Sequence, residues 1–298
     1  PSSLRTALAR KWRLPAPAEI ELRDHTGVAT GTKIRGDLAD YGFQDKASAV
    51  EWALENLFPW CSPDYFYNLD HSDVDYAVQH RAFCTNLSYI STDAGRGTSE
   101  QQLAEQILAA FQQRRDRSRP YFWVIGLQPP ERQGVMTLSR YGGVNTMTNM
   151  AQNWSFHTKV TCSAGSWRQQ SRPQRESPPA NTRLLAFVAS ECTTQKASGD
   201  GMQHGAWLDP ARGKVAINWG MSAAFATQAP AVVDFYYSTA TPNDYFVSGE
   251  IGAGMGFAVP PLMPDDSWQA LLADAVPLWR DMDLSCMDIY ANDGYYDG

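Results

Sequence analysis

The sequence predicts an α/β fold, in the form of a distorted or incomplete (β/α)8-type barrel. Three observations predict it. Continuous apolar runs typical of strands buried on both faces recur along the chain, the clearest at residues 121–127. Segments with apolar residues at helical spacing alternate with these runs in the first half of the chain. The runs are numerous enough for a barrel, but helical patterns between the later runs are weak, which favours a distorted or incomplete barrel over a regular one.

The expected elements follow in chain order. Four segments have helical patterns: 46–58, 73–80, 98–115 and 263–283. Eight segments are typical of strands: 64–70, 82–90, 121–127, 184–190, 215–219, 232–237, 245–249 and 286–291. The helix at 98–115 is the clearest, because Ser99 can cap it and Leu103, Ile107 and Phe111 form an apolar stripe. Pro277 is expected to bend or shorten the last helix.

The chain of 298 residues divides by pattern into two parts. Residues 1–74 form an N-terminal segment of unclear role, and residues 75–298 form the barrel domain. We expect this domain to be truncated at its C-terminus, because the chain stops directly after the last predicted strand.

Composition excludes several functional classes. The net charge of −7 argues against a nucleic-acid partner. No apolar run reaches the ~18 residues of a membrane span. The five cysteines have no zinc-ligand spacing, so no metal is expected.

The glycine-rich stretch at 249–256 is not a phosphate-binding loop, since it lacks a following Lys-Ser/Thr and leads to Pro260-Pro261 rather than a helix. It indicates backbone with positive φ, or a close approach to a ligand, and no cofactor is expected.

Acidic residues follow several predicted strands, at the ends where barrel enzymes build their sites. Glu191 follows the strand at 184–190, Glu250 the strand at 245–249 and Asp293 the strand at 286–291. Asn243 and Asp244 come after the strand predicted at 232–237. The sequence therefore predicts carboxylates gathered on one rim.

Paired carboxylates can hydrolyse a glycosidic bond, one protonating the leaving oxygen and the other attacking the sugar or activating water. We assign Glu191 and Glu250 to this catalytic pair. Asn243, Asp244 and Asp293 are candidate substrate-binding residues, and Trp219 is a candidate wall of the sugar pocket. Asp209 is expected to cap a turn and to pair with Arg212.

Two stretches carry a family resemblance: WLDPARGKVAINWGMS at 207–222 and YYSTATPNDYFVSGEIGAGMGF at 236–257. Together with DYAVQHRAFCTNLSYI at 75–90, they resemble segments of the GxGYxYP family in matching order. The resemblance implies a barrel-like glycoside hydrolase that acts on a glycan or polysaccharide. It also implies a secreted or cell-surface location, with which the glycosylation acceptors Asn86 and Asn153 agree.

Some residues depart from the family pattern. Met255, Phe257 and Ala258 replace the Tyr, Tyr and Pro of the naming loop, and Ser190-Glu191-Cys192-Thr193 stands in place of a Gly-Asp-x-Asp element. These departures support an alternative function, a non-catalytic glycan-binding or structural extracellular subunit capable of self-assembly.

Overall fold

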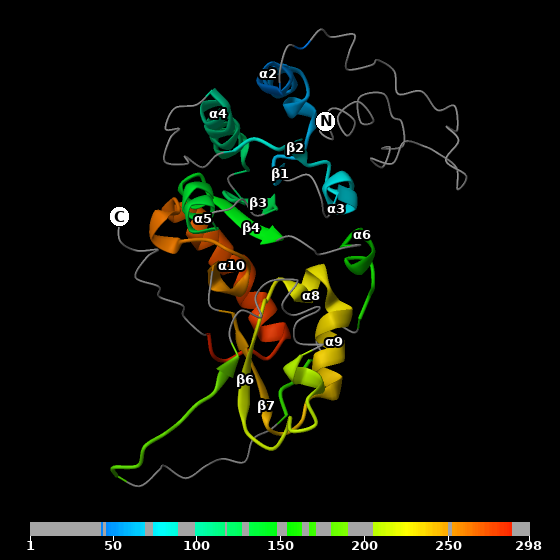
Figure 1. Ribbon diagram of the computed structural model, residues 1–298, viewed down its shortest axis with the longest axis vertical. Coiled ribbons are helices and arrows are strands. Elements are labelled where there is room, and N and C mark those ends of the chain that lie inside the picture. Colours follow the sequence, from blue (N-terminus) through cyan, green and yellow to red (C-terminus); the bar gives the residue numbers. More distant parts are fainter. Residues whose placement is uncertain are drawn as a thin grey trace, which may run out of the picture. The chain divides into compact units, whose positions relative to one another are not determined.

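The computed structural model describes residues 43, 46–68, 74–88, 99–116, 118–126, 131–147, 154–162, 167–170, 180–189, 205–249 and 252–287. The chain forms two compact units (Figure 1). Unit 1 comprises Pro1–Ser155 with Ala258–Trp268, and unit 2 comprises Phe156–Phe257 with Gln269–Gly298. Within the described ranges, every helix is too short or too polar to cross a membrane.

Unit 1 is built on a four-stranded parallel sheet with the strand order β2-β1-β3-β4. The strands are β1 Tyr65–Asn68, β2 Phe83–Thr85, β3 Phe122–Ile125 and β4 Gly143–Met147. Helices separate successive strands (Figure 1): α3 Val74–Gln79, α4 Ser99–Arg114 and α5 Glu131–Arg140. Because β2 and β3 lie on opposite sides of β1, the strand order reverses between β1 and β3.

The core of unit 1 lies between this sheet and the helices α2 Lys46–Asn56 and α4. Aromatic rings fill it: Phe111 of α4 stacks on Phe122 of β3 with centroids 4.9 Å apart, and Phe58 meets Phe83 edge-on at 5.3 Å. All four residues of β3 are buried, as in parallel sheets with both faces covered. The barrel domain is expected from the sequence to begin at residue 75. Strand β1 lies before that residue and belongs to the sheet of unit 1.

Unit 2 contains a three-stranded parallel sheet with the order β5-β6-β7. The strands are β5 Val188–Ala189, β6 Ile217–Met221 and β7 Asp244–Ser248. Its helices are α8 Phe225–Gln228, α9 Pro230–Thr239 and most of α10 Asp265–Asp281; the short α6 Trp154–His157 spans the boundary between the units. Met287 forms a single parallel bridge with Ser248, so the chain after α10 runs beside the end of β7.

The prediction of an α/β fold is confirmed, since every described strand pair is parallel and helices lie between the strands in sequence. The described strands form two separate sheets and do not show a barrel. The predicted helices at 46–58, 73–80, 98–115 and 263–283 are all present, the last continuing beyond Pro277 to Asp281. The sequence patterns did not predict α5 and β4.

The strand predicted at 232–237 is wrong, because these residues belong to helix α9. Pro230 occupies the first turn, where a helix tolerates proline best. The buried residues Pro230, Val233 and Tyr236 recur every third position, whereas Asp234 and Phe235 are exposed. This helical spacing of buried side chains outweighs the strand preference of valine and aromatic residues.

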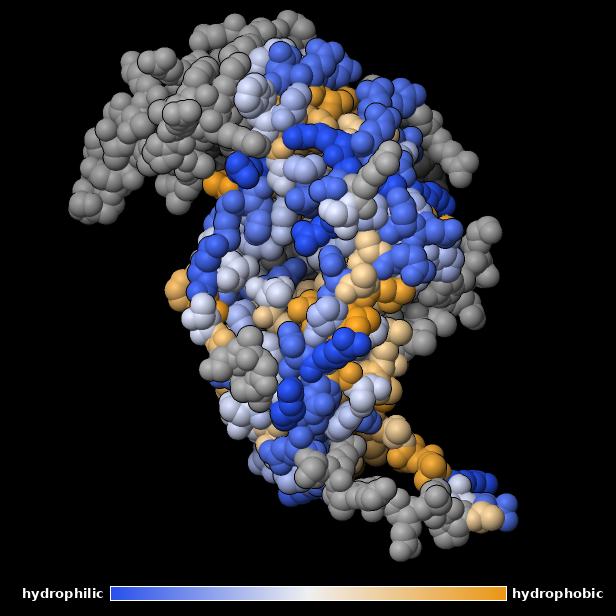
Figure 2. Space-filling view, turned by 180° about the vertical axis from the view of Figure 1, so that it is seen from behind, coloured by the Kyte–Doolittle hydropathy of each residue, from blue (hydrophilic) through white to orange (hydrophobic). Residues whose placement is uncertain are grey.

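The run at 184–190 was expected to be a buried strand, but only Val188–Ala189 pairs with β6. Leu184, Leu185 and Phe187 are 77%, 80% and 49% exposed. They form the apolar arm that is orange in Figure 2. The prediction of burial is therefore wrong for this run within the described residues.

Candidate functional site

The segment WLDPARG begins with the short helix η4 Ala206–Leu208 and continues as a tight turn. Asp209 caps this turn, because its Oδ1 accepts a hydrogen bond of 2.7 Å from the main-chain N–H of Ala211. Gly213 has φ +84°, a conformation that side-chain-bearing residues rarely adopt. The predicted turn-capping role of Asp209 is confirmed.

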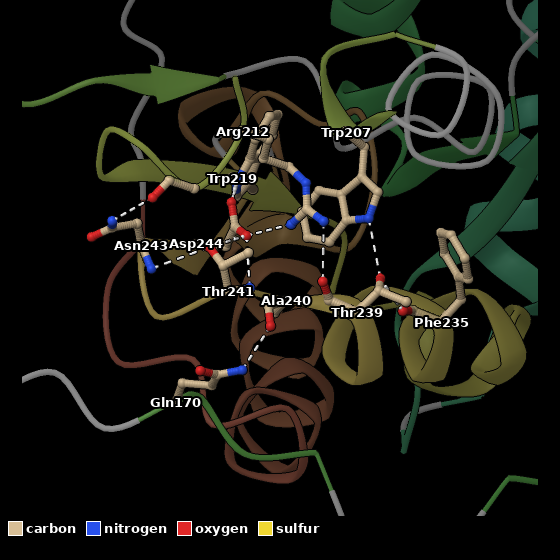
Figure 3. A network of polar contacts seen from close by, with 11 residues as sticks. Gln170, Trp207, Arg212, Trp219, Phe235, Thr239, Ala240, Thr241, Asn243 and Asp244 are labelled. Atoms are coloured by element: carbon tan, nitrogen blue, oxygen red, sulfur yellow. Dashed lines mark hydrogen bonds and ion pairs between the residues drawn. The ribbon is translucent and has the colours of Figure 1, made fainter. Parts of the chain in front are cut away.

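The predicted pairing of Arg212 with Asp209 is wrong, since Arg212 forms its ion pair with Asp244 (Figure 3). The guanidinium also lies 4.2 Å above the ring of Trp207 and donates to the carbonyl oxygen of Thr239 at 3.2 Å. Arg212 therefore joins the turn after η4 to the end of α9 and the start of β7.

The carboxylate of Asp244 is enclosed by donors (Figure 3). Its Oδ1 accepts from the indole N–H of Trp219 at 2.9 Å. Its Oδ2 accepts from Arg212, and from the N–H and the hydroxyl of Thr241 at 2.8 Å each. Such a set of donors supplies the hydrogen bonds that a buried carboxylate needs.

These contacts fix the charge of Asp244. Burial raises the pKa of the carboxyl, but the hydrogen bonds from Thr241 and Trp219 and the charge of Arg212 outweigh burial, so that the pKa lies below its ordinary value. Asp244 is therefore ionised at neutral pH, and the ion pair with Arg212 is complete.

Trp207, which contacts Arg212, lies at the centre of an aromatic cluster. It meets Trp219 at 5.3 Å and Tyr236 at 4.9 Å edge-on, and it stacks on Phe246 at 5.9 Å. Its indole N–H donates to the hydroxyl of Thr239 at 3.1 Å. The cluster packs α9 and the turn after η4 against the sheet of unit 2.

The structure places three sequence-predicted site residues in this network. Trp219 is 2% exposed and Asp244 is 3% exposed, so both side chains face the interior of unit 2. The Asn243 side chain donates to the carbonyl oxygen of Gly213 at 2.6 Å and ties the turn to β7. The sequence did not predict that Trp207, Thr239 and Thr241 belong to the network. Trp207 and Thr241 lie within the W-x-D-P and T-P-N-D stretches, and these motifs could have pointed to them.

Asp244 is the first residue of β7 and so lies at the amino end of the strand. The expectation that Asn243 and Asp244 follow the carboxyl end of a strand is wrong, because the preceding element is α9. The network around Arg212 therefore lies at the opposite edge of the sheet from the residues that follow β7.

The glycine-rich loop, which contains η5 Gly252–Gly254, packs against the carboxyl ends of β6 and β7. The carbonyl oxygen of Gly254 accepts from the N–H of Ala223 at 2.8 Å and from the hydroxyl of Ser222 at 2.9 Å. Gly254 has φ +69°, and a Cβ at this position would stand 2.2 Å from Oγ of Ser248. The predicted positive φ is confirmed. The backbone of Gly254 lies close to Ser248 of the protein's own strand β7.

The predicted catalytic residues Glu191 and Glu250 lie outside the described residues, and so does the candidate binding residue Asp293. Glu191 and Glu250 come shortly after the last residues of β5 and β7, Ala189 and Ser248.

Two family models match the chain. The model described as "GxGYxYP third domain" matches residues 55–159, and the one described as "GxGYxYP putative glycoside hydrolase C-terminal domain" matches residues 181–297. The chain belongs to the GxGYxYP family. No curated protein matches it.

One solved structure has a similar fold, described as a putative hydrolase from Bacteroides thetaiotaomicron VPI-5482. The TM-score is 0.64 and the sequence identity is 18% over 80% of this chain. The match covers 44% of that protein, so this GxGYxYP chain spans less than half of its length. At this identity the similarity concerns the fold.

Proposed function

We propose that this GxGYxYP chain is a glycoside hydrolase that uses Glu191 and Glu250 at the carboxyl edge of the β5-β6-β7 sheet. The supporting observation is topological: β5 and β7 run parallel on either side of β6. The carboxyl ends of β5 and β7 therefore lie at the same edge of the sheet. The name of the matching C-terminal domain model supports the reaction class.

The spacing of the strands suits this chemistry. Neighbouring strands lie about 4.8 Å apart, so that β5 and β7 are separated by about 10 Å. Paired carboxyl groups of glycosidases lie about 5–5.5 Å apart in retaining enzymes and about 6.5–9.5 Å apart in inverting enzymes. Side chains that lean toward each other across the end of β6 can reach either distance.

The remaining candidate residues divide between the two edges. Met287 is bridged to Ser248 at the end of β7, and we assign Asp293, which comes later in the chain, to sugar binding. Trp219 and Asp244 are buried, and with Asn243 they position β7 rather than contact sugar in this proposal. The distorted barrel expected from the sequence and a secreted or cell-surface location belong to the same proposal.

The test is release of reducing sugar from a panel of glycans by the wild-type chain and by the E191Q and E250Q variants. We expect each substitution to lower kcat by at least about 100-fold, because it removes an acid–base or nucleophilic group. The matched control is E55Q, at an exposed position of α2 in unit 1, which should retain full activity. Full activity of both E191Q and E250Q would show that Glu191 and Glu250 are not the catalytic pair.

A second candidate function is a non-catalytic glycan-binding or structural subunit. The favouring observation is the naming loop, in which Met255 and Ala258 replace Tyr and Pro and are 4% and 1% exposed. These apolar residues are buried in the fold and offer no hydroxyl to a ligand. Under this hypothesis the purified chain binds glycans or self-assembles without turnover, and hydrolysis by the wild-type chain would exclude it.

A further inference from the structure

The chain contains two triplets of the form Asn-x-Ser/Thr, which oligosaccharyl transferases recognise. One is Asn86-Leu87-Ser88, and the other begins at Asn153, which lies outside the described residues. Such triplets also occur by chance, so the position of the asparagine in the fold decides whether it suits modification. A suitable asparagine faces solvent and lies outside helices and strands, because the attached sugar is bulky and strongly hydrated.

Asn86 meets both conditions. It directly follows Thr85, the last residue of β2, and residues 86–88 belong to no helix or strand. Burial alternates along this stretch: Thr85 and Leu87 are 8% and 0% exposed, whereas Asn86 is exposed and Ser88 is half-buried. This alternation is typical of extended backbone, in which successive side chains point to opposite sides. The side chain of Asn86 therefore points out of unit 1.

Asn68 of β1 fixes this direction, because it holds the residues on both sides of Asn86. Its Oδ1 accepts from the hydroxyl of Thr85 at 2.6 Å, and its Nδ2 donates to the carbonyl oxygen of Leu87 at 2.9 Å. The side chain of Leu87 also packs in the hydrophobic core of unit 1. Since Thr85 and Leu87 are held inside, Asn86 between them is held on the outside.

Asn56 provides a comparison within the same unit. It is exposed and is followed by a leucine, as Asn86 is, but the residue two positions later is Phe58 rather than a serine. It is also the last residue of helix α2, and its Nδ2 donates to the carbonyl oxygen of Trp52 at 2.9 Å. Asn56 therefore shares the exposure of Asn86 and lacks the hydroxyl that the transferase recognises.

We propose that Asn86 is an N-glycosylation site, which receives an oligosaccharide when the chain passes through a secretory pathway that holds an oligosaccharyl transferase. The donor is an oligosaccharide linked to a lipid diphosphate. A bond forms between Nδ2 of Asn86 and C1 of the first sugar, and the bond between C1 and the diphosphate oxygen breaks. The lipid diphosphate leaves, one amide proton passes to solvent, and no atom is oxidised or reduced.

The inference rests on the secreted or cell-surface location that is part of the proposed function. It does not rest on the catalytic pair, because Asn86 belongs to unit 1 and Glu191 and Glu250 belong to unit 2.

The first experiment is translation of the full chain, preceded by a cleavable signal peptide, in the presence of endoplasmic-reticulum microsomes. We expect N86Q and S88A each to carry one oligosaccharide fewer than the wild type, whether or not Asn153 carries another. S88T should retain the wild-type number, because it keeps the hydroxyl. The same number of oligosaccharides on N86Q and wild type would overturn the proposal. Transfer takes place during translocation, so the result does not depend on whether a variant folds.

The second experiment is peptide mass spectrometry of the wild-type chain secreted by a eukaryotic host. Enzymatic release of N-linked sugars converts each modified asparagine to aspartate, and we expect this conversion at Asn86 and not at Asn56. The matched variant N56Q should carry the same number of oligosaccharides as the wild type. A secreted chain in which Asn86 is unconverted would overturn the proposal.

Hydrolysis assays separate this inference from the proposed function. N86Q should retain the kcat of the wild type, whereas E191Q and E250Q should lose turnover and keep the oligosaccharide at Asn86. An inactive wild-type chain that carries the oligosaccharide would overturn the proposed function alone. An active chain without the oligosaccharide would overturn the inference about Asn86 alone.

Discussion

The two edges of the β5-β6-β7 sheet differ in how their polar groups are used. At the amino edge, the carboxylate of Asp244 accepts from Arg212, Trp219 and Thr241, and its charge is paired inside the fold. At the carboxyl edge, the buried hydroxyl of Ser248 has no hydrogen-bond partner among the described residues. The difference indicates that the polar groups of the amino edge hold the fold together through hydrogen bonds, whereas Ser248 at the carboxyl edge is held by close packing against Gly254 of the glycine-rich loop.

The largest expected effect comes from breaking the amino edge. Arg212→Met leaves the buried carboxylate of Asp244 without its cation, and removing one partner of a buried ion pair costs about 3–5 kcal/mol of unfolding free energy. The measurement is urea unfolding at pH 7.

The matched control for that comparison is D266N, which breaks the ion pair between Arg115 and Asp266 in unit 1. Asp266 is 59% exposed, and exposed pairs contribute at most about 1 kcal/mol. If R212M and D266N both lower the free energy of unfolding by about 1 kcal/mol or less, the contacts of Asp244 at the amino edge do not stabilise the fold.

A smaller effect is expected at the carboxyl edge from Gly254→Ala. The new Cβ would stand 2.2 Å from Oγ of Ser248, and the backbone has φ +69°, so we expect a loss of about 1–3 kcal/mol. The double variant S248A/G254A should recover part of this loss, because the clashing oxygen is gone. Thermal or urea unfolding measures both.

Gly213→Ala is the matched control, since Gly213 also has positive φ (+84°) but a Cβ there would meet Thr241 only at 3.2 Å. We expect it to cost less than G254A. A larger loss for G213A would show that contact with Ser248 does not constrain the glycine-rich loop.

The smallest effect is a pH dependence of the amino edge. The pKa of Asp244 is lowered in the folded protein, so the unfolded chain binds more protons between the two pKa values. The stabilisation is complete above the unfolded pKa of about 3.9 and is lost as the pH falls through the folded pKa. The stability gap between wild type and D244N, measured by urea unfolding, should narrow below pH ~4. A constant gap down to pH ~3 would contradict the lowered pKa.

Local patterns in the sequence determined most of the secondary structure. The apolar stripe of 98–115, the buried run of 121–127 and the turn at Asp209 depend on neighbours in sequence, and the structure contains all three. The positive φ at Gly254 was also predictable, because closely spaced glycines are typical of backbone that residues with a side chain rarely adopt.

The tertiary structure decided the rest. Residues 232–237 have the composition of a strand. They form a helix because that conformation buries Val233 and Tyr236 inside unit 2. The partner of Arg212 is Asp244 rather than nearby Asp209, because the parallel pairing of β6 with β7 brings distant residues together. Sequence spacing cannot report such contacts, since they depend on which strands become neighbours and on which charges are buried with them.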